Sequence, residues 1–141
     1  MISITEAFCA DRLLELAEDE VSPGGNAIRT LIWEKASTSA VSTWSGIQDA
    51  YKNWYEIKPS WTRVNQLIEV RNAIAHGLGQ LTRIQRNKRA STTTKIALAN
   101  IDLNGDNIVL EEANLVNVRN ACIALISEID ELVQAKTGDI T

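Results

Sequence analysis

The residue types that favour phosphate chemistry come together in residues 71–76, which read RNAIAH. The guanidinium of Arg71 is suited to gripping phosphate oxygens in bidentate fashion and to balancing the charge that grows in a phosphodiester transition state. His76 is the only histidine of the chain. An imidazole can take a proton from a ribose 2′-hydroxyl or give one to a leaving 5′-oxygen. The amide of Asn72 can hold the imidazole or the phosphate. These three residues are the catalytic candidates.

Helical geometry decides how these side chains relate to one another. We expect a helix from Trp61 to His76, on which Arg71 and His76 lie about 140° apart. Steps of three, four and seven residues place Asn65, Glu69, Asn72 and His76 on one polar stripe, with Glu69 in a supporting role. One histidine cannot easily serve as base and acid on opposite sides of one phosphorus. A two-fold dimer would supply two histidines and two arginines.

The same helix is predicted to carry an apolar face with Arg71 in its middle. Its apolar members are Val64, Leu67, Ile68, Ile74, Ala75 and Leu78. A buried guanidinium without a partner costs several kcal/mol, so Arg71 must meet an anion or reach a cleft. The structural alternative is that Arg71 forms a salt bridge with Glu69 or an acidic helix, while His76 caps its own helix. The residues alone leave both interpretations open.

Charge is unevenly distributed along the chain. The net charge is −4, yet residues 57–101 hold eight bases and one acid, between acidic flanks. Directly after the motif, residues 82–95 (TRIQRNKRASTTTK) hold five bases and no acid. If the motif cleaves RNA, these side chains are expected to contact its phosphates and to make binding salt-dependent. The predicted substrate-binding residues are Arg83, Arg86, Lys88 and Arg89. The alternative is an exposed, solvated loop.

Hydrophobic periodicity predicts an all-α bundle of four to five helices in one domain, residues 1–141. Ser3 and Glu6 form a capping box for the first helix. A helical stretch from about Asn26 to Ile57 is bent or split at Ser45-Gly46. Pro59-Ser60 caps the motif helix, and Gly77 and Gly79 stop it, with a glycine at the C-cap. Residues 81–89 read as a short helix or a loop, and about 112–136 as the clearest helix.

A small β-hairpin is expected just before this last helix. Apolar residues alternate with period two at Ile96, Leu98, Ile101 and Leu103, and again after the tight-turn signal Asn104-Gly105. Residues 102–106 also begin like a calcium loop. Position six would be Asn107 and position twelve Ala113, so we reject calcium binding.

Other functional classes find little support. No apolar run approaches the roughly 18 residues of a membrane span, and the N-terminus is acidic where a signal peptide would be cleaved, so we expect a cytoplasmic protein without membrane contact. A single histidine argues against a multi-ligand metal site, and no cofactor motif is present. Cys122 lies in the apolar stripe of the last helix, which argues against a Cys–His nucleophile. Trp33, Trp44 and Tyr51 share a helical face, which favours core or dimer packing over RNA stacking.

Residues 71–76 resemble the R-x4–6-H motif of the HEPN superfamily (higher eukaryotes and prokaryotes nucleotide-binding domains), in the form with Asn after Arg. The surroundings are similar too, because the motif ends a central helix and a long C-terminal helix closes the predicted bundle. The resemblance covers most of the chain, although only these six residues match a motif. It implies a homodimer whose motifs face each other, and metal-independent endoribonuclease activity that leaves a 2′,3′-cyclic phosphate.

Members of that family act as toxins or in antiviral defence, so the resemblance also implies an antitoxin or sensor protein as partner. HEPN toxins controlled by a nucleotidyltransferase antitoxin often carry a Tyr two residues after the motif His. This chain has Leu78 there, so we do not expect that mode of control. Two other interpretations stay open. One is a non-catalytic HEPN module that binds a nucleotide, RNA or a partner protein, and the other is a purely structural dimer.

Overall fold

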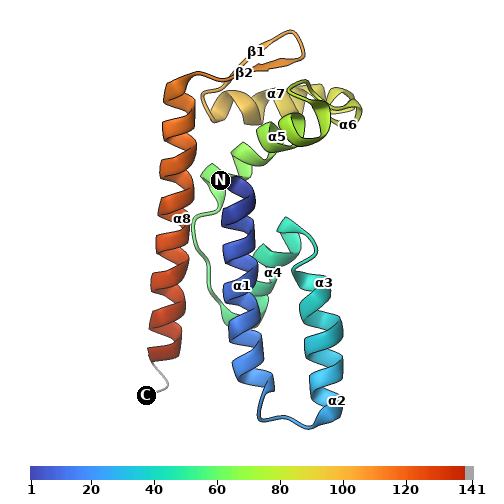
Figure 1. Cartoon of the computed structure of the whole chain (residues 1–141), viewed down its shortest axis with the longest axis vertical. Helices are drawn as coiled ribbons and strands as arrows, with labels where there is room; N and C mark the ends of the chain where they lie inside the picture. The colour runs from blue at the N-terminus through green and yellow to red at the C-terminus, as the bar shows by residue number, and fades with distance from the viewer. Residues whose placement is uncertain (139–141) are drawn as a thin grey trace. The chain divides into compact units, whose positions relative to one another are not determined.

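The computed structural model describes residues 1–138 (Figure 1). They form mostly helices and one two-stranded hairpin just before the long α8 (Glu112–Gly138), which confirms the predicted all-α fold. The chain divides into two compact units. Residues 1–2 and 60–125 make up the motif unit. Residues 3–59, with the part of α8 from Ile126 onward, make up the tyrosine unit.

The tyrosine unit is built around one fully buried tyrosine. Most of α1 (Ile2–Val21) and all of α4 (Trp44–Tyr55) belong to it. Tyr51 is completely buried, and its hydroxyl donates a 2.6 Å hydrogen bond to the carbonyl oxygen of Cys9. Burial raises the pKa of Tyr51 well above its usual range. Because α1 begins at Ile2, Ser3 lies inside the helix, and the capping box predicted with Glu6 is wrong.

The predicted split in the second helical stretch is confirmed, but it lies a few residues earlier. The segments α2 (Asn26–Ile28), η1 (Arg29–Ser37, a π-helix) and α3 (Thr38–Ala40) follow one another without a break. The chain leaves the helix at residues 41–43, and the Thr43 hydroxyl caps α4 by accepting a 3.0 Å bond from the Gly46 N–H. Gly46 lies within α4, where a Cβ would collide with the carbonyl oxygen of Ala40.

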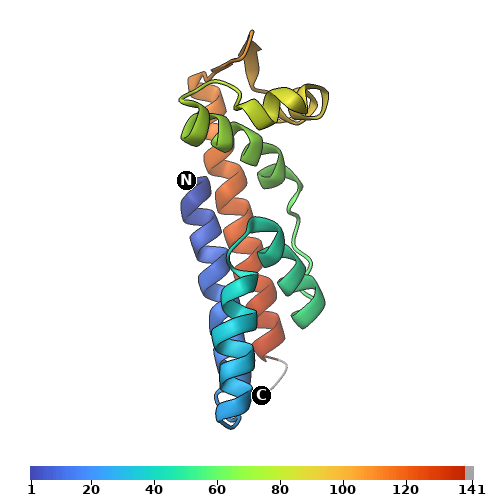
Figure 2. The ribbon, with the colours of Figure 1, turned by 90° about the vertical axis from the view of Figure 1, so that its right-hand side faces the viewer.

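The motif unit packs α5 (Thr62–Gly77) against α7 (Arg89–Leu98), with the short α6 (Arg83–Asn87) between them in sequence. Its core unites side chains from α5, α7 and the first half of α8, and Figure 2 shows these helices clustered within this unit. The core residues are Leu67, Val70, Ala73, Leu81, Ile96, Ile101 and Ala121. In addition to the helices of the expected bundle, the structure thus contains α6, where a short helix or a loop was expected, and α7, which was not expected.

The hairpin is confirmed, but it is shorter than the alternating pattern. Strands β1 (Asp102–Asn104) and β2 (Asn107–Val109) pair antiparallel, and Gly105 takes a left-handed conformation in the turn (φ 63°). Assigning Ile96 to a strand was wrong, because it lies in α7. The chain turns after α7 at Asn100 (φ 59°). Ile96, in α7, and Ile101, just before β1, therefore both reach the core. The period-two pattern there spans a helix end.

The bounds of α5 agree with the prediction, but its buried face does not. The buried residues are Val64, Leu67, Val70 and Ala73. Ile74, Ala75 and Leu78 are exposed, and Arg71 is half-buried, so the prediction of a buried apolar face centred on Arg71 is wrong. The helix offers two apolar stripes, and contact with α7 and α8 selects one of them.

The ends of α5 also differ from the expected caps. The N-cap residue is Trp61 instead of Ser60. At the other end the helix stops at Gly77, but the left-handed C-cap residue is Leu78 (φ 54°), followed by Gly79 (φ 92°). A glycine was expected in this C-cap conformation because it lacks the Cβ that makes left-handed backbone costly. The actual C-cap side chain, Leu78, is 93% exposed.

Candidate functional site

A pocket of about 520 Å³ opens beside the C-terminal half of α5 in the motif unit. We call it the motif pocket. The polar stripe of α5 supplies one side, and α6 with the start of α7 supplies the other. Its lining residues are Glu69, Asn72, His76, Thr82, Arg83, Ile84, Gln85, Lys88 and Thr92. The pocket therefore gathers residues on both sides of the turn that follows the motif.

The turn after α5 is held in place by the hairpin. The N–H of Leu81 donates to the carbonyl oxygen of Asp106 at 2.8 Å, and the N–H of Ile108 donates to the carbonyl oxygen of Gly79 at 2.8 Å. A capping box then starts α6: the Gln85 N–H donates to the Thr82 hydroxyl at 3.2 Å, and the Thr82 N–H donates to the Gln85 side chain at 3.0 Å. These bonds place the first turn of α6 opposite the polar stripe of α5.

Glu69 ties α5 to both neighbouring helices. The buried Gln85 side-chain amide donates to the Glu69 carbonyl oxygen at 2.7 Å and to its carboxylate at 2.9 Å. Lys95 Nζ lies 3.6 Å from the other carboxylate oxygen. Among the described residues 1–138, Glu69 is the only acid that lines the motif pocket, and its charge faces Lys95. Arg83 and Lys88 therefore leave the lining with a positive balance, which suits an anionic ligand.

Asn72 and His76 enter the pocket from the same side of α5, four residues apart. His76 is exposed in the last turn of the helix, and Asn72 is half-buried. Within residues 1–138, neither side chain has a hydrogen-bond partner. An imidazole that is open to the pocket can bind and release protons, and an adjacent amide can orient a ligand oxygen.

The remaining predicted site residues do not line this pocket in one chain. Arg71 is half-buried and lies about 140° around α5 from His76. Arg86 is exposed outside the lining. Arg89 forms an ion pair with Asp106 and donates a 3.4 Å bond to the Gly105 carbonyl oxygen, so it is held against the hairpin turn.

Besides the apolar Ile84, three polar pocket residues were not predicted, and these are Thr82, Gln85 and Thr92. The first two carried a readable signal, because Thr followed three residues later by Gln is a capping box pattern that starts a helix. Recognising it would have favoured a helix over a loop for this segment. Thr92 had no signal of its own, since only the packing of α7 on α5 brings it to the pocket.

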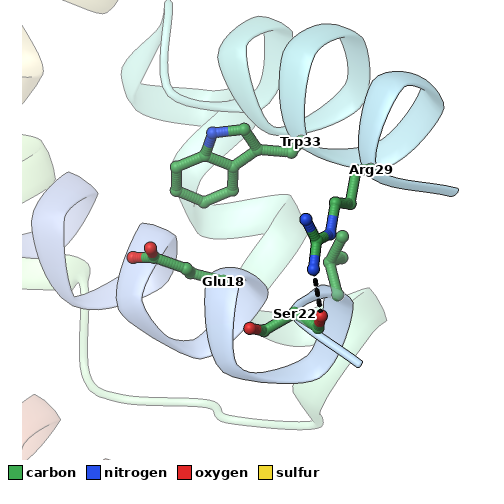
Figure 3. A pocket seen from close by; sticks show the side chains of 5 residues that line it. Glu18, Ser22, Arg29 and Trp33 are labelled. Atoms are coloured by element: carbon green, nitrogen blue, oxygen red, sulfur yellow. Dashed lines mark hydrogen bonds between the residues drawn. The ribbon is translucent and has the colours of Figure 1, made fainter. Parts of the chain in front are cut away.

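A second pocket lies in the tyrosine unit and has a different character. It measures about 230 Å³ and is lined by Glu18, Val21, Ser22, Arg29 and Trp33. Figure 3 shows the guanidinium of Arg29 donating to the Ser22 carbonyl oxygen, at 2.7 Å, near the indole of Trp33. The guanidinium thus stabilises the end of α1 and is less available to a ligand than the side chains of the motif pocket.

Comparison with known protein families, with curated proteins and with solved structures found no match to this chain. Across residues 1–138, no helix has both the length and the apolar character needed to cross a membrane. In the same residues, no three His, Cys, Asp or Glu side chains are grouped so that they could hold a metal ion. The geometry of the motif pocket therefore carries the functional argument.

Proposed function

We propose that this chain is a metal-independent endoribonuclease of the HEPN type that acts as a homodimer. The observation that carries the proposal is the position of Asn72 and His76 in one pocket with Arg83 and Lys88. A proton-transfer group, an orienting amide and two cations are suited to cleavage of a phosphodiester by its own 2′-hydroxyl.

In this mechanism His76 of one chain removes the proton from the ribose 2′-hydroxyl, and the 2′-oxygen attacks the adjacent phosphorus. The protonated His76 of the second copy gives a proton to the 5′-oxygen as its bond to phosphorus breaks. The products are a 2′,3′-cyclic phosphate and a 5′-hydroxyl. Arg71 stabilises the charge on the phosphoryl oxygens, and Asn72 orients a phosphate oxygen or an imidazole. Arg83 and Lys88 hold neighbouring phosphates.

The exposed side of α5 supports a second copy as the missing half of the site. Ile74 and Ala75 follow Arg71 by three and four residues on this side, and Leu78 comes three residues after Ala75, at the end of the helix. Ile74 is 44% exposed and Leu78 is 93% exposed. A second copy that covers these apolar side chains would bring Arg71, which lies outside its own chain's pocket, toward the composite site.

The first test is cleavage of single-stranded RNA by the purified protein in excess chelator. We expect products that end in a 2′,3′-cyclic phosphate, and a rate that falls about 10²- to 10⁴-fold in His76→Ala. Arg71→Ala should also lose most activity, whereas Arg119→Ala, which changes an exposed arginine of α8, serves as the control. Activity that needs added metal, or that survives His76→Ala unchanged, would refute the mechanism. RNA affinity without cleavage, lost in Arg71→Ala, would instead indicate a non-catalytic binding module.

The second test addresses the dimer. Ile74→Glu places a charge on the exposed side of α5 and should shift the mass measured by light scattering from dimer to monomer, with loss of cleavage. Ile123→Glu is the matched control, because Ile123 is 53% exposed on α8 and lies in the same unit. A parent protein that is strictly monomeric at working concentration would remove the composite site.

A further inference from the structure

Two further pockets lie along α5 in the motif unit. One measures about 420 Å³ and is lined by Thr62, Asn65, Gln66, Ile68, Glu69 and Lys95. The other measures about 220 Å³ and collects four amide side chains, of Gln66, Asn100, Asn114 and Asn117, together with Arg63. We call these the middle pocket and the amide pocket.

The three pockets follow one another along α5 and neighbouring pockets share a lining residue, so we treat them together as one groove. Glu69 lines both the motif pocket and the middle pocket, and Gln66 lines both the middle pocket and the amide pocket. The groove therefore follows α5 backward from His76 to Arg63. At about 1.5 Å per residue, this stretch of helix is about 20 Å long. A stacked strand advances about 3.4 Å per nucleotide, so the groove has room for up to about six nucleotides.

Each of the three pockets of this groove is lined by at least one basic side chain. Arg83 and Lys88 line the motif pocket, Lys95 lines the middle pocket, and Arg63 lines the amide pocket. In the part of the chain that the structure describes, the only carboxylate in the three linings is that of Glu69, which is bonded to Gln85 and faces Lys95. Spaced positive charge with a single, already engaged acid suits a phosphodiester backbone.

The amide pocket has the chemistry of a nucleobase site. Asn114 is buried and rigidly held, since its side chain accepts from the Glu111 N–H at 2.8 Å and donates to the Asn100 carbonyl oxygen at 2.8 Å. Within residues 1–138, the side chains of Gln66 and Asn117 have no such bonds. Amide side chains pair with the donor and acceptor edges of bases. Apolar side chains in the lining, Leu98 and Val118, offer surface for the face of a base.

We infer that a single-stranded RNA segment lies along α5 from the motif pocket to the amide pocket, and that the amide pocket recognises a base several nucleotides from the bond that is cut. This inference rests on the proposed function and adds to it a binding path and a site of base preference. The inference requires a single-stranded substrate, because a base can enter the amide pocket only when it is unpaired.

The test measures binding of labelled oligoribonucleotides of two to ten nucleotides to the full chain carrying His76→Ala, which prevents cleavage. We expect affinity to rise with length up to about six nucleotides and then to level off. Gln66→Glu and Asn117→Asp each put a carboxylate into the groove at nearly constant volume. Both should weaken binding of the longer oligonucleotides about fivefold or more, and leave dinucleotide binding nearly unchanged. Asn120→Asp makes the same charge change on the exposed surface of α8, outside the three linings, and is the control.

Each outcome separates the inference from the proposed function. If the parent cleaves RNA through His76 but Gln66→Glu and Asn117→Asp bind like Asn120→Asp, the groove is overturned and the function stands. If the parent neither cleaves nor binds RNA, the function itself fails. Binding of an acidic peptide in preference to RNA, weakened by Gln66→Glu, would assign the groove to a protein partner and overturn the inference. Equal affinity for oligomers of all four bases, unaltered in Asn117→Ala, would overturn base recognition.

Discussion

The bonded polar side chains of the tyrosine unit contrast with two open side chains in the motif pocket. In the tyrosine unit they bond to the protein itself: Tyr51 to the Cys9 carbonyl oxygen, and Arg29 to the Ser22 carbonyl oxygen. Arg12 there donates to Asp130 at 2.8 Å. In the motif pocket, Asn72 and His76 stay open. A polar group whose bonds are internal stabilises the fold, whereas one that remains open is available to a ligand.

The motif pocket is not without internal bonds, and these show how the open groups are positioned. Gln85 is buried and binds Glu69 twice, while its backbone and side chain cap α6. Glu69 and Gln85 therefore act as a bracket between α5 and α6, and His76 and Arg83 extend from the two helices that the bracket joins. Substitutions in the bracket should affect stability, whereas substitutions of Asn72 and His76 should affect only ligand binding and the proposed cleavage.

The largest effect on stability is expected in the tyrosine unit. Tyr51→Ala removes a fully buried ring and should lower the free energy of unfolding by about 3–5 kcal/mol. Tyr51→Phe loses only the hydroxyl and its bond, which should cost about 1 kcal/mol. Urea unfolding monitored by circular dichroism measures both. His76→Ala is the matched control from the motif pocket and should unfold like the parent. A large loss of stability in that variant would contradict the difference between the buried tyrosine and the open histidine.

A smaller effect is expected for the bracket residue. Gln85→Ala removes the amide that binds Glu69 and caps α6, and should lower the free energy of unfolding by about 1–3 kcal/mol. Gln80→Ala changes an exposed glutamine in the preceding turn and is the control. If Gln85→Ala unfolded like Gln80→Ala but lost cleavage, the amide would belong with the open groups instead of the bracket.

The smallest expected effect is a loss of stability of the tyrosine unit at alkaline pH. Burial raises the pKa of Tyr51 well above its ordinary value of 10.0. The folded state thus keeps the proton that the unfolded state releases above pH 10. The contribution of this group to the free energy of unfolding is fully present below pH 10. It is lost as the pH rises further, by about 1.4 kcal/mol per pH unit. Unfolding curves at pH 9 and 11 should show this loss. The slope should weaken in Tyr51→Phe; an unchanged slope would exclude Tyr51 as its source.

Burial also raises the pKa of Tyr55, with a hydrogen bond to Glu20 as the next cause, so some alkaline sensitivity should persist in that variant. Both tyrosines of the chain lie in the tyrosine unit. The motif unit has no tyrosine, so the alkaline loss should originate in the tyrosine unit alone.

Features with local causes were predictable from the sequence. The bounds of α5 were anticipated within a residue or so, and the hairpin turn at Asn104-Gly105 was placed correctly. The long α8 was also expected, because its apolar residues recur at helical spacing. Each of these signals lies within one continuous segment of the chain, so no distant contact was needed to interpret it.

Features with distant causes were not predictable. The motif helix carries two apolar stripes, and the sequence does not say which one meets α7 and α8. Ile96 alternates with its neighbours as a strand residue would, yet α7 buries it as a helical residue. Packing between segments far apart in the chain decides both cases, since burial depends on the partner and not on spacing alone.

The available chemistry follows from the amino-acid sequence, which places one Arg-Asn-x-x-x-His segment at the end of a helix. Glu69, Asn72 and His76 share one stripe because a helix repeats every 3.6 residues. Which basic side chains lie opposite that stripe depends on the tertiary structure. Arg83 and Lys88 line the pocket because the hairpin anchors the turn before α6, whereas Arg89 is drawn to Asp106 in the hairpin itself. The spacing of residues on one helix is a local property, but the contents of a pocket between helices depend on contacts that only the folded chain makes.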